Sequence, residues 1–178
     1  MGHTEREIHN PRTGQRMRFL RTTADTDGAL LRIESVNPPT GIAEPEHTHP
    51  QQESRAEVIS GTLRFVVHDE ERRLGPGEAI TIPAGTPHYF VNDGEQDAVS
   101  IQEFRPALRT AEFFRTLFDL AERGKLDERG MPSLLTLARL GPEFADEIRA
   151  TSPPWWVQRV AFVLLAPTAR LRGAARPS

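Results

Sequence analysis

Residues 77–92 read Gly77-Glu-Ala-Ile-Thr-Ile-Pro83-Ala-Gly85-Thr-Pro-His88-Tyr-Phe-Val-Asn92. Upstream lies a second informative stretch, Gly41-Ile-Ala-Glu-Pro-Glu-His47-Thr-His49. His47 and His49 stand two positions apart, so on a strand both side chains project from the same face. A β-barrel can bring this pair beside His88. Neutral imidazole is the commonest metal ligand in proteins, and three imidazoles can hold a transition metal with coordination positions left open.

The two stretches resemble the paired motifs of the cupin superfamily. The second cupin motif reads Gly, five residues, Pro-x-Gly, two residues, His, three residues, Asn, and residues 77–92 match it at every position. The first motif is matched at Gly41, His47, His49 and Gly61. The resemblance covers roughly residues 15–105. It implies a mainly β fold, the cupin double-stranded β-helix or jelly-roll barrel, but no particular reaction, because one fold hosts many chemistries.

The departure from the first motif is its glutamate. Counting back from Gly61 places Ser54 at that position, and the nearest carboxylate, Glu53, lies one residue earlier. The alternation of apolar and charged residues along this strand predicts that Ser54 faces the barrel interior and Glu53 faces away. A neutral hydroxyl is a poor metal donor. Two alternatives stay open: Glu53 turns inward and joins the three histidines as a metal ligand, or the site has no carboxylate.

The same strand suggests a wide cavity. Similar cupins carry glutamate and an aromatic residue where this chain has Ser54 and Ala56. Both differences remove volume from the cavity wall, and a wider, less charged interior suits a larger and more apolar ligand. We expect Ser54, Ala56, Phe90 and Gln52 to contact the substrate. The three histidines are expected to serve as catalytic residues as well as metal ligands.

The chain is predicted to have two parts. Residues 1–107 show short strands separated by turn residues, which is typical of a β-barrel. Residues 108–178 change to a helical pattern, and we expect this C-terminal extension to pack on the barrel or on a dimer partner. The fold class is therefore a cupin barrel with C-terminal α-helices.

Three helices are expected in the C-terminal part. Apolar residues at helical spacing predict the first over residues 110–123, with Thr110 as its N-cap. Two more are expected over residues 133–140 and 153–166, ended by Gly141-Pro142 and by Pro167.

Composition narrows the possible partners. The chain has 178 residues, a formal net charge of -3 and no cysteine. Disulfides and thiolate metal sites are therefore excluded. The charge gives no reason to expect a nucleic acid or an anionic membrane as partner. Because the longest apolar run, residues 160–166, falls far short of the roughly 20 that span a bilayer, and no signal-peptide core is present, we predict a cytoplasmic protein.

Three classes of function fit these observations. The first is a metal-dependent oxygenase or isomerase of a small organic metabolite, with a divalent Fe, Zn, Ni or Mn held by the histidines. The resemblance to cupin-like thiol dioxygenases, whose three-histidine sites lack a carboxylate, implies that loss of the glutamate does not exclude catalysis. The second is a metal-free cyclase or isomerase of an apolar natural-product intermediate, in which a histidine acts as general acid or base. The third is a non-enzymatic module that binds a small molecule.

The C-terminal helices also predict assembly. They carry more apolar side chains than one barrel flank needs, and an exposed apolar patch usually marks an interface. Edge strands of an open barrel invite pairing across a two-fold axis. We therefore expect a homodimer whose interface uses barrel edge strands.

Overall fold

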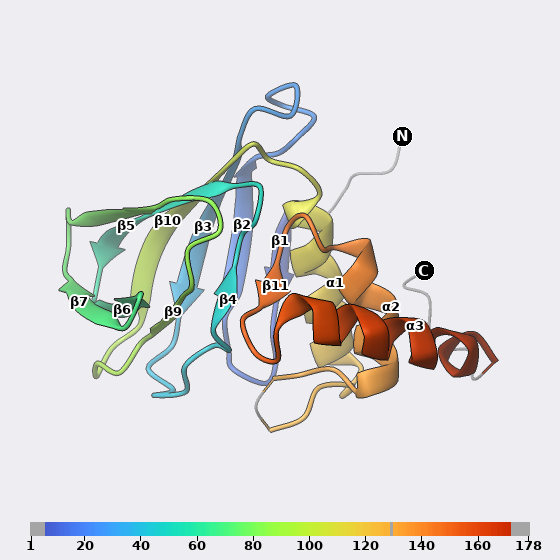
Figure 1. Cartoon of the computed structure of the whole chain (residues 1–178). Helices are drawn as coiled ribbons and strands as arrows, with labels where there is room; N and C mark the ends of the chain where they lie inside the picture. Colours follow the sequence, from blue (N-terminus) through green and yellow to red (C-terminus); the bar gives the residue numbers. More distant parts are fainter. Residues whose placement is uncertain (1–5, 129, 172–178) are drawn as a thin grey trace.

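The computed structural model describes residues 6–128 and 130–171, with side chains described up to residue 165. The described chain forms two antiparallel sheets packed as a sandwich, with three helices grouped on one side of it (Figure 1). This confirms the predicted mainly β fold with C-terminal helices. The first sheet has the strand order β1 (Glu7–His9), β2 (Arg16–Arg21), β3 (Leu31–Asn37), β10 (Ala98–Arg105), β5 (Glu53–Ser60) and β8 (Ala79–Ile82). The second has the order β11 (Arg149–Ala150), β4 (His47–Thr48), β9 (His88–Val91), β6 (Leu63–Val67) and β7 (Glu70–Leu74).

Strand β5 shows why the sequence alternation was informative. Ser54, Ala56 and Val58 are at most 8% exposed, whereas Glu53 is exposed. The strand already begins at Glu53, so this residue obeys the alternation and faces away from the interior. The alternative in which Glu53 turns inward is therefore wrong.

Two hydrophobic clusters hold the sandwich and its helices together. One lies between the sheets and is built around Val58, Leu63 and Phe65. The other joins the first sheet to helix α1 (Thr110–Glu122), with Phe19 and Phe104 from the sheet packed against Phe118 from the helix. Burial of large aromatic side chains is the dominant stabilising term in such contacts. Helix α1 is therefore an integral layer of the core.

The close approach of two strands requires glycine at one turn. Gly61 joins β5 to β6 with a φ of +73°, a conformation that L side chains rarely adopt. A Cβ atom at this position would lie 2.6 Å from the backbone oxygen of Asp97. The glycine of the first motif is thus a packing requirement of the fold.

The predicted N-cap of the first helix and the predicted end of the second are wrong. Arg109 is the N-cap of α1, and Thr110 is its first residue. The Thr110 hydroxyl instead forms hydrogen bonds with the side chain of Gln52. These bonds hold the start of the helix against the barrel. Helix α2 (Leu134–Glu143) runs through Gly141-Pro142. The Phe162 ring packs so closely on Gly141 that a Cβ atom there would lie 2.5 Å from it.

The last helix is also longer than predicted. Helix α3 spans Trp155–Leu171 and therefore does not end at Pro167. A proline removes one backbone hydrogen bond and kinks a helix, but it need not end it. No helix of the described residues is long and apolar enough to cross a membrane.

The C-terminal part adds a strand that the sequence did not predict. Strand β11 lies between α2 and α3 and pairs antiparallel with β4, placing Ala150 opposite His47. The second sheet therefore extends into the region expected to be helical. Whether residues 1–107 form a unit of their own stays a prediction.

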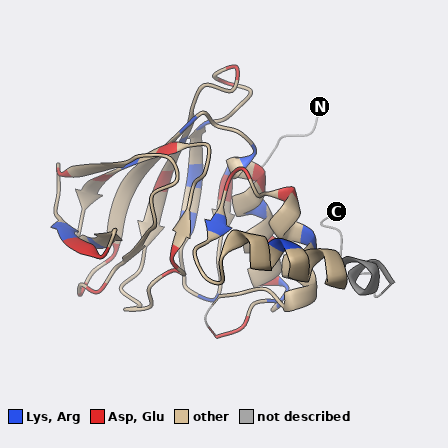
Figure 2. Ribbon diagram, in the orientation of Figure 1, with Lys and Arg blue, Asp and Glu red and all other residues tan. Residues whose placement is uncertain are grey.

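Charged side chains mark one edge of the second sheet. Strand β7 has the sequence Glu-Glu-Arg-Arg-Leu, and Figure 2 shows both signs of charge on it. Its first four residues are exposed. Charged edges oppose pairing with another chain, so β7 is a poor candidate for the edge-strand dimer contact expected from the sequence.

Candidate metal centre

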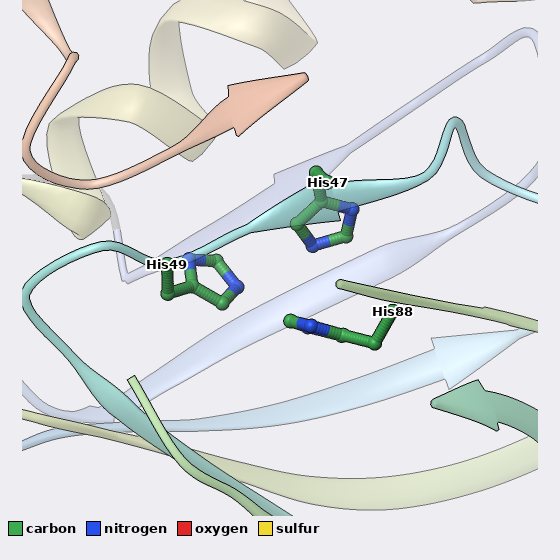
Figure 3. Close-up of side chains that lie close together, drawn as sticks. All are labelled: His47, His49 and His88. Atoms are coloured by element: carbon green, nitrogen blue, oxygen red, sulfur yellow. The ribbon is translucent and has the colours of Figure 1, made fainter. Parts of the chain in front are cut away.

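Strands β4 and β9 bring the three histidines together. The two strands pair antiparallel with His47 directly opposite His88, and His49 lies just beyond the end of β4. The ring centroids are 4.5 Å apart for His47 and His88, 5.0 Å for His47 and His49, and 5.2 Å for His49 and His88. Figure 3 shows the rings facing a common space. The clustering predicted from the motif spacing is confirmed.

Each ring is held by a backbone carbonyl. The Nδ1 atom lies 2.9 Å from the Pro45 oxygen in His47, 2.7 Å from the Glu147 oxygen in His49, and 2.8 Å from the Thr86 oxygen in His88. A carbonyl only accepts hydrogen bonds, so each Nδ1 must carry the proton and donate it. The Nε2 lone pair of each ring is then free. Fixing the tautomer in this way is the usual outer-shell support of a metal-binding histidine.

Burial keeps the cluster uncharged. The three side chains are at most 9% exposed. Desolvation lowers the pKa of His47 well below its usual value, and repulsion from the other two rings lowers it further. Desolvation also lowers the pKa of His49 to about 4 and lowers the pKa of His88. The rings are therefore neutral near pH 7, which is the form that binds metal.

The donor set fits a transition metal. One ligand atom from each ring can be chosen so that the three lie within 4.8 Å of one another. Three imidazoles suit Zn, Fe or Ni and leave further coordination positions for water or substrate. Among the described residues, no Asp or Glu joins this group. Ser54 stands on the inner face, as predicted, and Glu53 points away.

A cavity of about 260 Å³ opens beside the histidines. One wall belongs to the barrel and includes Ser54, Ala56, Phe90 and Gln102. The opposite wall comes from the C-terminal region, with Phe113, Leu117, Leu140, Phe144 and Phe162 among its residues. The helices thus complete the cavity. From the sequence, these helices were expected to pack on the barrel or on a dimer partner.

The expected substrate contacts divide into two groups. Ser54, Ala56 and Phe90 line the cavity, where contact with a ligand is possible. Gln52 does not line it. Its side chain is 0% exposed and donates to the Pro106 and Ala107 carbonyls and to the Thr110 hydroxyl. These hydrogen bonds anchor the start of α1 to Gln52, which directly precedes β5.

Two carboxylates in the cavity wall were missed. Glu44 and Glu46 precede the first histidine in the motif and line the cavity. Desolvation by the surrounding protein raises the pKa of Glu44 to about 8, although the residue keeps partial exposure. Glu46 accepts a hydrogen bond from the Thr151 hydroxyl, and its charge opposes the lowering of the pKa of His88. Their position just before His47 was the available signal.

Comparison with known proteins supports the fold assignment. Residues 34–101 match the family model described as "Cupin domain", and this range contains all three histidines. The chain thus contains a cupin domain. No curated protein matches the chain.

Several solved structures are similar to the chain at low sequence identity. A predicted oxalate decarboxylase from Thermotoga maritima is 20% identical, with a TM-score of 0.50, covering 56% of this chain and 90% of that chain. KdgF from Halomonas sp. is 24% identical, with a TM-score of 0.49, covering 55% of this chain and 85% of that chain. The DMSP lyase DddQ from Ruegeria pomeroyi DSS-3 is 27% identical, with a TM-score of 0.41, covering 46% of this chain and 40% of that chain. Likeness at this level carries no statement about the reaction.

Proposed function

We propose that this cupin is a metal-dependent enzyme, an oxygenase or isomerase, that acts on a small organic metabolite in the cavity beside its histidine cluster. The observation that carries the proposal is the shared arrangement of His47, His49 and His88. Each ring is buried, and each donates its Nδ1 proton to a carbonyl. Three lone pairs aimed at one space are costly to desolvate unless a partner binds them.

The chain's own residues have three tasks in this proposal. The histidines hold the metal, and a divalent Fe, Zn, Ni or Mn bound to them would supply a Lewis acid or a redox centre. The apolar walls exclude water and orient the substrate. Glu44, whose pKa is raised to about 8, holds a proton at pH 7 and can donate it to a substrate oxygen.

Metal analysis of protein purified without an affinity tag or chelator tests this function. Wild type is expected to carry a divalent transition metal in proportion to protein, and His47→Ala is expected to lose it. His68→Ala is the matched control, because His68 is exposed and lies outside the cluster. Ser54→Glu should raise metal affinity, since it adds a charged donor on the inner face. Wild type and Ser54→Glu protein that both bind no metal would refute the proposal.

One observation favours a second candidate, a metal-free cyclase or isomerase of an apolar intermediate. Ser54 replaces the expected carboxylate, while Glu44 offers a protonated carboxyl group in the same cavity. Such a pairing of carboxyl and neutral imidazole supports acid and base catalysis without a metal. Turnover that persists in a chelator and fails in Glu44→Gln would favour this candidate. Ligand binding without any turnover would favour a binding module.

A further inference from the structure

The barrel wall of the cavity presents two polar side chains that lack partners. In the register of β5 and β10, Ser54 lies opposite Phe104 and Ala56 opposite Gln102, so Ser54 and Gln102 are diagonal neighbours on one face. Each is 8% exposed, and both line the cavity. Within the described part of the chain, neither side chain makes a hydrogen bond. Neither is among the buried atoms that lack a partner, so their hydrogen-bonding atoms are accessible inside the cavity and can bind a polar group on a ligand.

The rest of the cavity is a row of aromatic rings. It begins at His49, whose ring lies 5.1 Å from Phe104, and continues with Phe114 at 5.9 Å from Phe104. Phe113 follows at 5.5 Å from Phe114, and Phe144 ends the row at 5.7 Å from Phe113. All five residues line the cavity. A ligand that reaches from the histidines toward α2 therefore contacts apolar, largely aromatic surface along its length.

The basic residues of the lining do not favour an anionic ligand. Besides histidine, the basic residues of the lining are Arg55 and Arg149. Arg55 is paired with Glu57 at 2.9 Å. Arg149 donates to the Ala145 carbonyl and lies over the Trp155 ring. Both guanidinium groups are thus engaged, and the lining offers an anionic ligand no cation that is free of other contacts.

The volume sets the size of the ligand. An engineered apolar cavity of about 150 Å³ holds one benzene molecule. The cavity of about 260 Å³ is less than twice as large. It therefore suits a molecule of one or two rings, or a branched chain of similar bulk.

We infer that the cavity takes a neutral, mostly apolar molecule of this size with a carbonyl or hydroxyl oxygen that Ser54 and Gln102 bind. This assigns a substrate class to the proposed enzyme and in that sense rests on the proposed function. The binding itself follows from the cavity and does not require the metal. The apolar body of the ligand lies along the aromatic row, and its oxygen lies at the end nearer the histidines.

Calorimetric titration of the full chain with three matched probes tests this inference. The probes are naphthalene, 2-naphthol and 2-naphthoate, which share a ring system and differ in one substituent. Each is titrated with and without chelator. We expect 2-naphthol to bind about threefold to tenfold more tightly than naphthalene, as one or two neutral hydrogen bonds allow. The charged 2-naphthoate should bind more weakly than either.

Two variants locate the oxygen. Gln102→Leu keeps similar bulk and removes the amide, so it should abolish the preference for 2-naphthol while leaving naphthalene binding intact. Gln96→Leu is the control, because Gln96 is exposed and does not line the cavity. Leu140→Gln, at the apolar end, should weaken both neutral probes.

The outcomes separate this inference from the metal function. Binding of 2-naphthol by a protein that carries no metal when purified without chelator, and whose Ser54→Glu variant also binds none, would support the ligand class and refute the metal-dependent enzyme. A metal-loaded protein that binds none of the neutral probes would do the reverse. Tighter binding of 2-naphthoate than of 2-naphthol would overturn the inference, as would a Gln102→Leu variant that keeps the preference for oxygen.

Discussion

The buried histidines make the protein sensitive to acid, and one substitution can isolate the effect of His49. Its side chain is 5% exposed, and desolvation lowers its pKa from 6.5 to about 4. Because the folded pKa lies below the unfolded one, the unfolded chain binds the proton first as the pH falls. The stabilising contribution is therefore complete above pH 6.5 and is lost as the pH falls toward 4.

The size of the loss follows from the two pKa values. Each pH unit in this window costs about 1.36 kcal/mol per proton. His49 alone therefore removes about 3 kcal/mol from the free energy of unfolding by pH 4. That is a large share of the 5–15 kcal/mol typical of a small protein. His47 and His88 act in the same direction, because their pKa values are also lowered.

Urea unfolding between pH 7.5 and pH 4, in the presence of a chelator, measures this loss. His49→Gln should lose about 3 kcal/mol less than wild type over the range, whatever its stability at pH 7.5. His68→Gln should follow wild type, because His68 is exposed and lies outside the cluster. If His49→Gln and wild type decline in parallel, His49 is not held neutral by burial and the account of the cluster is wrong.

Three further predictions follow from the fold. Gly61→Ala should lower the free energy of unfolding by roughly 3 kcal/mol or more, because its Cβ would meet backbone atoms at 2.6 and 2.8 Å. Gly77→Ala should lower it by about 1 kcal/mol, because Gly77 has a positive φ but nothing within 4 Å of the added Cβ. Equal losses of the two variants in urea unfolding would contradict this. Ala56→Phe should block binding of 2-naphthol with little change in Tm, and a large fall in Tm with binding retained would place the pocket elsewhere. Trp156, 70% exposed on α3, is expected to lie in the homodimer interface, so Trp156→Glu should lower the mass measured by light scattering; an unchanged mass would exclude this face.

The features that the sequence determined are those set by local geometry. Successive side chains of a strand point to opposite faces, and this alternation predicted Ser54 on the inner face and Glu53 on the outer face. Motif spacing brought His47, His49 and His88 together, because the two motifs occupy paired strands of one barrel. These relations depend on spacing along the chain and on strand pairing within a known fold, so the sequence is enough to predict them.

The features that only the tertiary structure decided depend on residues far apart in the chain. The carbonyl that sets the tautomer of His49 belongs to Glu147, 98 positions away. Strand β11 and the helices complete the cavity only because the C-terminal region folds back onto β4. Gln52 was expected to contact substrate, but Thr110 of α1 engages its side chain. The raised pKa of Glu44 likewise comes from desolvation by the folded protein around it, an energy that exists only when those atoms are packed together.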